Sequence, residues 1–195
     1  MDDSDALALG RWAAGDRTAG AELVERWFAA IARFFRGKVR DSIELQDDLV
    51  QATFAALLEA APRFRGEGTF RSFLFTIAYN TLRKHYERAR RDERIDFGTV
   101  SVHDLEPGPL SKLAERAEQA LVLDALQRLP LELQTALELF YWESLTAAEI
   151  GDALGLPEGT VKTRLRRARM LLRELVEAAA ADPATRAAAL ASIAE

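Results

Sequence analysis

The feature of this sequence that most restricts its fold is the spacing of its apolar residues. They recur every three or four positions along nearly the whole chain of 195 residues. Such spacing places side chains on one face of an α helix. The alternation of apolar and polar residues that marks a half-buried strand is not found between turn signals. The sequence therefore predicts an all-α protein.

The same periodicity, read together with helix-ending residues, predicts where the helices lie. Pro62 and the Leu129-Pro130 step are expected to end helices. Asp182 followed by Pro183 is typical of a helix start, so a short Ala-rich helix is expected in the tail. The other expected helices cover 3–14, 17–36, 43–61, 69–91, 113–128 and 131–142, and a helix-turn-helix pair fills 146–178.

One stretch, residues 92–111, differs in character from the rest. It combines scattered acids and little periodicity with Gly98, Pro107, Gly108 and Pro109. Such a composition favours a flexible linker. The sequence thus predicts two small helical domains, at 1–91 and 112–178, joined by a linker at 92–111 and followed by a tail at 179–195.

Residue composition excludes several classes of function. Cysteine is absent, and His85 and His103 are not in a metal-ligand spacing. No phosphate-binding loop or nucleophile–base pair is found. No apolar run approaches the roughly 18 residues of a membrane span, and the first residues are acidic where a signal peptide is basic. We therefore expect a cytoplasmic protein that is not an enzyme, holds no metal or cofactor and does not insert into a membrane.

The charges are unevenly distributed, although the net charge is −5. Residues 160–173 hold six basic residues and no acid, and residues 83–94 hold six basic residues against three acids. Two basic clusters on an acidic chain indicate two contacts with nucleic acid. The alternative for either cluster is a solvated helix face with no partner.

The segment 146–178 has the start, turn and restart signals of a helix-turn-helix. Thr146 and Glu149 form a capping-box pattern, Gly155 suits a left-handed helix end, and Pro157 suits the next helix start. Apolar residues at steps of four, three and four then form one narrow stripe that is expected to face the core: Val161, Leu165, Ala168 and Leu172.

The opposite face of this last helix is basic. An apolar back and a basic front are what a recognition helix in the major groove requires, since Arg, Lys and Thr can contact base edges or phosphates. A surface helix without a partner is the alternative, which the capping box, the Gly turn and the acid-free face disfavour. The candidate duplex-binding residues are Thr160, Lys162, Thr163, Arg164, Arg166, Arg167 and Arg169.

The segment EIGDALGLPEGTVKTRLRRARMLL resembles the promoter-binding helix-turn-helix of the extracytoplasmic-function (ECF) sigma factors of the sigma-70 family. The run GTVKTRLRRAR, residues 159–169, is typical of them, although response regulators also carry Thr-Val-Lys at the start of the reading helix. Two segments of the first domain decide between these families. DDLVQATF (47–54) resembles the helix that holds the polymerase clamp helices, and FRSFLFTIAYN (70–80) resembles the segment that melts and reads the minus-ten element.

The resemblance covers about residues 5–178 and implies roles for residues of the first domain. The candidates for binding core polymerase, at the clamp helices of its largest subunit, are Asp47, Asp48, Leu49, Gln51 and Phe54. Those for the minus-ten element are Phe64, Arg65, Arg71, Asn80, Arg83 and Lys84. The chain departs from the family at Phe73, where Trp is usual: the smaller ring keeps the packing role but lacks the indole N–H donor.

The chemistry of these residues agrees with those roles but leaves alternatives open. The carboxylates of Asp47 and Asp48 suit an Arg-rich partner, and they equally suit a helix start. Phe64 suits capture of an unstacked base, or it anchors the core. Asn80 offers both donor and acceptor to a base edge. The remaining aromatic residues of the first helices, Trp12, Trp27, Phe28, Phe34 and Phe35, are expected in the core.

The expected function is that of an alternative sigma factor, a subunit that directs bacterial RNA polymerase to chosen promoters. Its partners would be core polymerase, including subunits other than the largest, and promoter DNA. The family also implies an anti-sigma factor in many members, although no residue of the sequence identifies one. Two other functions remain open: a stand-alone helix-turn-helix regulator, and a sigma-like interaction protein that reads no promoter.

Overall fold

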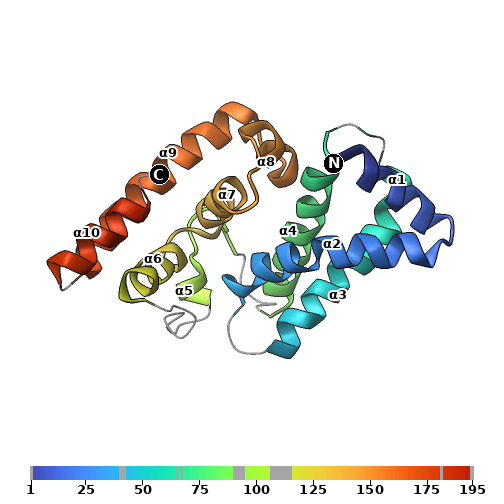
Figure 1. The fold of residues 1–195 in the computed structure, drawn as a ribbon. Helices are drawn as coiled ribbons and strands as arrows, with labels where there is room; N and C mark the ends of the chain where they lie inside the picture. Colours follow the sequence, from blue (N-terminus) through green and yellow to red (C-terminus); the bar gives the residue numbers. More distant parts are fainter. Residues whose placement is uncertain are drawn as a thin grey trace.

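The computed structural model describes residues 2–39, 43–64, 66, 68–89, 95–105, 116–180 and 182–193. Over these residues the chain is all-α, as predicted, and the one strand-like pairing is an isolated bridge between Ser101 and Pro130 (Figure 1). The helices are α1 (Asp2–Ala13), α2 (Arg17–Arg36), α3 (Ile43–Ala60), the 3-10 turn η1 (Ala61–Arg63), α4 (Phe70–Ala89), α5 (Val102–Leu105), α6 (Ala117–Gln127), α7 (Leu131–Tyr141), α8 (Ala147–Leu154), α9 (Glu158–Ala179) and α10 (Pro183–Ser192). None of the helices in the described part of the chain has the length and apolar character needed to span a bilayer.

Helices α1 to α4 form the N-terminal domain around an aromatic core. Asp16 caps α2 by accepting hydrogen bonds from the backbone N–H groups of Thr18 and Ala19, each 3.0 Å long. Trp27 and Phe34 on the buried face of α2 meet rings of α4, with centroids 5.8 Å from those of Phe70 and Phe75 respectively. Both ring pairs are tilted, with interplanar angles of 51° and 52°, and aromatic contacts at such distances stabilise the core.

The N-terminal aromatic residues follow the prediction with one exception. Trp27, Phe34 and Phe35 are buried and Trp12 is half-buried. Phe28, expected in the core, is 46% exposed, because it lies one position beyond Trp27 and turns toward the edge of α2. Its ring helps to line a shallow groove between α1 and α2.

Residues 95–105 are packed against the protein, which differs from the expectation that 92–111 acts only as a tether. Phe97, Val102 and Leu105 are buried. The backbone N–H groups of Leu131 and Glu132 donate to the carbonyls of Val100 and Phe97, at 2.9 and 3.1 Å. Three apolar anchors spaced among turn residues leave no helical period, which is why the sequence pattern did not reveal them. Residues 92–94 and 106–111 lie outside the described residues.

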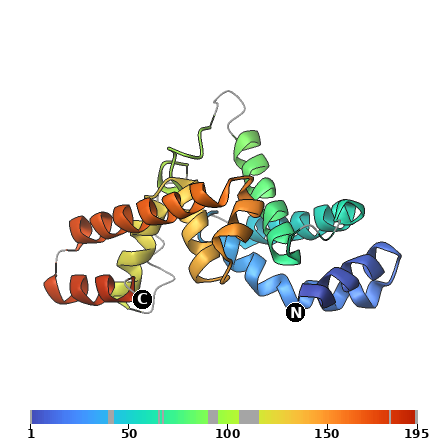
Figure 2. The ribbon, with the colours of Figure 1, turned by 90° about the horizontal axis from the view of Figure 1, so that it is seen from above.

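The C-terminal domain is built on the long helix α9, whose buried stripe packs on α6, α7 and α8. Val161, Leu165, Ala168 and Leu172 are all buried, as predicted. Helix α10 turns back beside α6 and α9 (Figure 2). It begins as predicted, because the Asp182 carboxylate accepts from the backbone N–H of Thr185 at 2.8 Å.

The two helical domains are in direct contact. The start of α4 and the short helix α8 face one another at the centre of Figure 1, and they form an extensive contact between the two halves of the chain. Figure 2 shows the same neighbours from above. The first helix of the helix-turn-helix therefore packs against the helix that holds the candidate minus-ten residues.

Candidate nucleic-acid and polymerase interfaces

Local sequence signals position the helix-turn-helix as expected. The Thr146 hydroxyl accepts the Glu149 backbone N–H at 3.2 Å, and the Glu149 carboxylate accepts the Thr146 backbone N–H at 2.8 Å, which completes the capping box. Gly155 ends α8 with φ of 68°, a left-handed conformation that glycine adopts without a steric penalty. Pro157 then precedes α9 as its N-cap residue. These contacts fix the direction of α9 relative to α8.

The outer face of α9 presents the central candidate residues to solvent. Lys162, Thr163, Arg166 and Arg167 are all exposed. Lys162 pairs with Glu158 at 2.6 Å, and the Thr163 hydroxyl donates to the Gly159 carbonyl at 3.0 Å. Arg166 and Arg167 form no ion pair with any residue that the structure describes. Their guanidinium groups are therefore the most available donors on this face.

The candidates at the edges of this face are held by neighbours in the same domain. Thr160 is half-buried. Arg164 forms an ion pair with Glu132 of α7. Arg169 donates to the hydroxyl of Tyr141 at 2.8 Å and stacks over the Tyr141 ring at 5.5 Å. A side chain that is already held in this way loses less conformational entropy when it binds DNA, but it is less free to adjust its position to the DNA.

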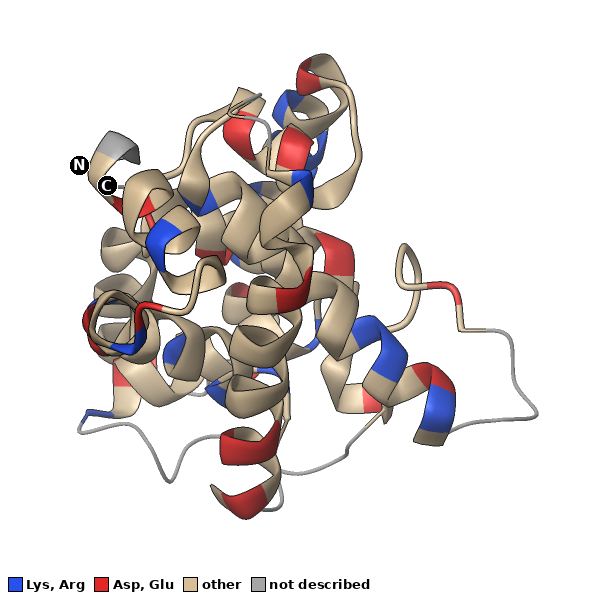
Figure 3. Cartoon of the chain, turned by 90° about the vertical axis from the view of Figure 1, so that its right-hand side faces the viewer, with Lys and Arg blue, Asp and Glu red and all other residues tan. Residues whose placement is uncertain are grey.

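The acidic face of α3 is open to solvent. Asp47, Asp48 and Gln51 are exposed, whereas Leu49 and Phe54 are buried in the domain core. Figure 3 views this side of the molecule, with the red, acidic first turns of α3 at its lower end. The structure thus brings the polar candidates together on one surface and places the two apolar candidates beneath it.

The second half of α4 carries three exposed candidates for contacting the minus-ten element. Asn80, Arg83 and Lys84 are exposed. Arg83 lies 3.4 Å from Glu87 and stacks over the Phe97 ring at 5.4 Å. The side chains therefore form a polar and basic strip along the end of the helix.

Phe64 lies at the opposite end of α4, in an aromatic cluster. Its ring centroid is 5.0 Å from that of Phe73 and 6.3 Å from that of Phe70. The side chain is half-buried rather than fully exposed. Arg65, the neighbouring candidate, lies outside the described residues. Phe73, where the family usually has Trp, takes part in this cluster as a half-buried packing residue.

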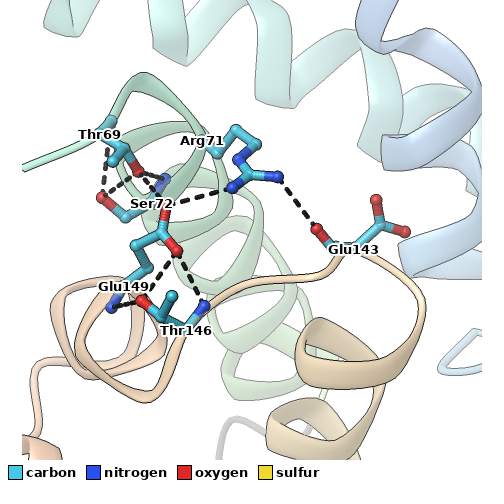
Figure 4. A network of polar contacts seen from close by, with 6 residues as sticks. All are labelled: Thr69, Arg71, Ser72, Glu143, Thr146 and Glu149. Atoms are coloured by element: carbon cyan, nitrogen blue, oxygen red, sulfur yellow. Dashed lines mark hydrogen bonds and ion pairs between the residues drawn. The ribbon is translucent and has the colours of Figure 1, made fainter. Parts of the chain in front are cut away.

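Arg71, the remaining candidate, is bound by the C-terminal domain. Its guanidinium donates to the Glu143 carbonyl and to Glu149 Oε1, both at 3.3 Å (Figure 4). Thr69 donates to the same Glu149 oxygen at 3.0 Å. Burial acts to raise the pKa of Glu149, but hydrogen bonds from Thr146 and Thr69 and the charge of Arg71 outweigh it and hold this pKa below its ordinary value.

A second polar connection between the domains is fully buried. Lys38, just after α2, forms an ion pair with Glu138 of α7, and their side chains are 0% and 3% exposed. The Lys38 ammonium also donates to the Phe34 carbonyl at 3.0 Å and lies 4.0 Å from the Phe34 ring centroid. Burial lowers the pKa of Lys38 below its ordinary value, and the charge of Glu138 opposes part of that shift.

Neutral hydrogen bonds surround this buried pair. Gln134 donates to Glu138 Oε1 at 2.8 Å and to the Gly37 carbonyl at 3.1 Å. The Tyr86 hydroxyl donates to the Lys38 carbonyl. The sequence does not reveal this cluster, because its residues lie far apart in the chain and each has the character of an ordinary polar residue at a helix end or on a helix face.

The fold and the exposed basic face of α9 define an all-α protein of the helix-turn-helix class. The family model for "Sigma-70 region 2" matches residues 22–92, and the model for "Sigma-70, region 4" matches residues 119–172. Among curated relatives, RNA polymerase sigma factor CnrH of Cupriavidus metallidurans is 32% identical over 186 residues, which cover 91% of this chain and 96% of CnrH. The chain belongs to the ECF sigma factors of the sigma-70 family, the alternative sigma factors that direct promoter-specific transcription.

Other relatives and solved structures agree with this assignment. ECF RNA polymerase sigma-E factor of Haemophilus influenzae is 29% identical over 184 residues, which cover 89% of this chain and 96% of that protein. CnrH in complex with the cytosolic domain of CnrY matches with a TM-score of 0.68 and 27% identity, covering 91% of this chain and 99% of that one. RpoE in complex with the anti-sigma factor NepR from Bartonella quintana shares the fold, with a TM-score of 0.61 and 20% identity over 82% of this chain and 98% of that one.

Proposed function

We propose that this sigma factor acts through one polymerase-binding surface and two separate DNA-reading surfaces. Residues 1–91 form the domain that binds core polymerase and captures the melted minus-ten element. Residues 112–178 form the domain that reads the minus-thirty-five element as duplex. Residues 92–111 connect the two domains, and residues 179–195 form a C-terminal tail.

The observation that carries the duplex-reading role is the exposed basic face of α9. It lies opposite a stripe of buried apolar residues, so its orientation is fixed by packing, and its two central arginines have no ion-pair partner among the described residues. Arg166 and Arg167, with Lys162 and Thr163, are the residues that enter the groove in this proposal. Thr160, Arg164 and Arg169 contact the phosphates at its edges.

The minus-ten role is assigned to α4 and the segment before it. Asn80, Arg83 and Lys84 offer amide and cationic donors on one exposed strip. Phe64 and Arg71 join them from the other end of the helix, where an aromatic ring and a guanidinium group suit a base taken out of the duplex stack. Arg65, which follows Phe64 in the sequence, is assigned the same role. This surface would read single-stranded rather than duplex DNA.

The polymerase-binding role is assigned to Asp47, Asp48 and Gln51. They share an exposed face of α3 that contains no Lys or Arg. Leu49 and Phe54 hold that face in place from the domain core, instead of touching polymerase directly. Opposite charge on the clamp helices would steer association and set its orientation.

The chain acts on DNA in the cytoplasm, in association with the nucleoid, and makes or breaks no covalent bond itself. A protein inhibitor of the anti-sigma kind regulates it. The solved complexes of CnrH with CnrY and of RpoE with NepR support this last point by analogy.

Transcription in vitro, with core polymerase on a promoter library, tests the proposal directly. A sigma factor directs initiation from a subset of promoters only when core is present. A gel-shift assay with and without core separates the two alternatives. A stand-alone regulator would bind its site without core, and a sigma-like interaction protein would bind core but select no promoter.

A further inference from the structure

Met170 is the one large apolar side chain of α9 that projects into solvent. It is 56% exposed, whereas Leu165 and Leu172 of the same helix are buried. Helix α9 lies at the outer edge of the fold, so a partner can reach this side of the helix (Figure 1). The thioether of Met170 is therefore available for contact with a partner and contributes little to the core.

Met170 lies in the middle of the basic face that is proposed to enter the groove. At about 100° per residue, it lies two turns beyond Thr163 and one turn beyond Arg166 and Arg167. These three residues are exposed, and their directions on the helix surround that of Met170. Met170 is therefore opposite the buried stripe of α9, as are the residues assigned to base reading.

Acidic residues limit how far this face can follow DNA. Glu174 and Glu177 come four and seven positions after Met170 on the same side of α9, and both are exposed. Their carboxylates would repel the phosphates of DNA. Thr163 and Met170 are seven residues apart, which corresponds to about 10 Å along the helix axis and about three base pairs of DNA. The surface suited to base reading thus begins near Lys162 and ends at Met170.

Met170 offers a kind of contact that the basic residues of this face do not provide. Arg and Lys donate hydrogen bonds to acceptor atoms, which every base pair presents in the major groove. Thymine alone adds an apolar group there, its C5 methyl. The Thr163 hydroxyl already donates to the Gly159 carbonyl at 3.0 Å. A flexible thioether can adapt its position to a methyl group on the groove floor.

We propose that Met170 is a specificity-determining residue, whose thioether packs against the C5 methyl of a thymine in the minus-thirty-five element. This inference rests on the proposed duplex-reading role of α9. It adds an apolar contact to the hydrogen bonds expected from Arg166 and Arg167. The chain would thereby favour thymine at a position near the Met170 end of the element.

Replacement of thymine by uracil tests this contact, because uracil lacks only the C5 methyl. The preferred element is first selected with the wild-type holoenzyme from a randomised sequence, and each thymine is then replaced in turn. We expect one thymine at which the wild type loses about fourfold in affinity, the effect of no longer burying one methyl-sized group. A wild type that binds all these elements equally well would overturn the inference.

Substitutions at Met170 should abolish or preserve this uracil effect according to their chemistry. Met170→Gln keeps the length of the side chain but ends in an amide, so it should bind thymine and uracil elements equally. Met170→Leu should keep the difference. Thr163→Ser, which removes a methyl from the same face, and Leu7→Gln, at an exposed position of α1, are controls that should also keep it. A uracil effect that persists in Met170→Gln, or that disappears in Thr163→Ser instead, would show that Met170 does not make the contact.

Failure of this inference and failure of the proposed function give different results. A holoenzyme with no preference among minus-thirty-five elements would contradict both. A clear preference that is the same for thymine and uracil, and that changes in Arg166→Ala, would retain duplex reading by α9 and remove only Met170 from it. Circular dichroism of each variant verifies equal helical content, so that a change in affinity reflects the contact and not unfolding.

Discussion

At the scale of single residues, α9 separates its basic side chains into two kinds. Arg166 and Arg167 project into solvent without an ion pair among the described residues, whereas Arg164 and Arg169 are held by Glu132 and Tyr141. A side chain that reads a base edge contributes discrimination, and one bound only to phosphate contributes affinity that salt weakens. The structure therefore assigns different expected effects to neighbouring arginines.

Replacement of Arg166 or Arg167 by Ala should relax the preference for particular bases in the minus-thirty-five element. The loss is about 1–3 kcal/mol of discrimination for a good bidentate contact. Arg169→Ala should instead lower affinity for all sequences alike and reduce the salt dependence by about one unit of slope. Binding of each holoenzyme to a randomised element at two salt concentrations measures both quantities. An unchanged base preference in the Arg166 and Arg167 variants would contradict base reading by this face.

The acidic face of α3 gives a second prediction for single residues. The double variant Asp47→Lys with Asp48→Lys should weaken association with core polymerase. It changes the charge of this face by four units and so replaces attraction to a basic partner surface with repulsion. Glu22→Lys with Glu25→Lys makes the same change at exposed positions of α2 and is the control. Co-purification with core, at equal helical content, measures the effect. Equal recovery of the two double variants would remove α3 from the interface.

The sequence predicted which residues of α9 face solvent, because helical spacing alone separates the buried stripe from the basic face. It did not predict the partners of Arg71 or Arg164. Each arginine is one of 26 basic residues in a chain with 31 acidic ones, so charge identifies no particular pair. Arg71 pairs with Glu149, 78 positions away, and Arg164 pairs with Glu132, 32 positions away. These pairs form because the tertiary fold brings the residues together, so no local sequence pattern predicts them.

At the scale of whole elements, the packing of α1 on α2 depends on a glycine. A Cβ added to Gly20 would lie 2.5 Å from the Trp12 ring, whereas one added to Gly10 meets nothing within 4 Å. Both glycines lie inside helices. The two positions therefore separate the effect of helix propensity from the effect of steric overlap.

Gly20→Ala should destabilise the protein by about 1–3 kcal/mol through overpacking against Trp12. Gly10→Ala should stabilise it by roughly 0.5–1 kcal/mol, because alanine restricts the unfolded chain and favours the helix. Denaturant titration followed by circular dichroism compares the two. A stabilising effect of Gly20→Ala would show that the Trp12 ring moves aside without penalty.

Helix periodicity and capping signals do not predict the packing of the segment 95–105. Helix periods and caps predicted α2, α8 and α9 with nearly correct ends, since the stabilising contacts lie within three or four residues of one another. Phe97, Val102 and Leu105 pack against residues that are distant in sequence, and the turn residues around them predict a loop. A packed loop with a few buried apolar residues has the same composition as a flexible linker, so the sequence cannot distinguish the two.

This packing yields a prediction for the segment. The amide hydrogens of Leu131 and Glu132, bonded to the Val100 and Phe97 carbonyls, should exchange slowly in the free chain. Phe97→Ala should increase their exchange and destabilise the protein by about 3–5 kcal/mol, as expected for a buried Phe. Thr99→Ala, at an exposed position two residues away, should change neither. Fast exchange in the wild type would mean that the segment is a tether after all.

At the scale of the whole molecule, sequence patterns did not predict how the two domains are arranged. Each domain follows from local helix signals and a family resemblance. The contact between the domains depends on Lys38 and Glu138, which lie 100 positions apart in the sequence. It also depends on Glu149, for which the sequence predicted only a role in the capping box of α8. The same carboxylate caps α8 and binds Thr69 and Arg71, so one residue serves both the element and the assembly.

The double role of Glu149 makes domain contact dependent on pH. Its pKa in the folded chain lies below the ordinary value of 4.5, despite the opposing effect of burial, and part of the lowering comes from Thr69 and Arg71 of the other domain. A carboxyl group with a lowered folded pKa contributes stability that is fully present above the unfolded value and is lost as the pH falls through the folded value. Protonation of Glu149 removes the charge with which Arg71 pairs, so acidification through the lowered pKa of Glu149, below its ordinary value of 4.5, should weaken the contact between the domains.

Glu149→Gln isolates this contribution, because Gln can still complete the capping box but carries no charge for Arg71. At neutral pH the two domains should be in contact less often in the variant than in the wild type. The chain has no cysteine, so fluorescence transfer between labels on cysteines introduced at the exposed positions Ala29 of α2 and Glu174 of α9 measures this. On acidification the wild type should lose transfer and approach the variant, while the Lys38–Glu138 and Arg33–Glu143 pairs act alike in both. Circular dichroism over the same range separates domain opening from unfolding. Parallel pH profiles for the two proteins, with no convergence, would show that ionised Glu149 does not hold the domains together.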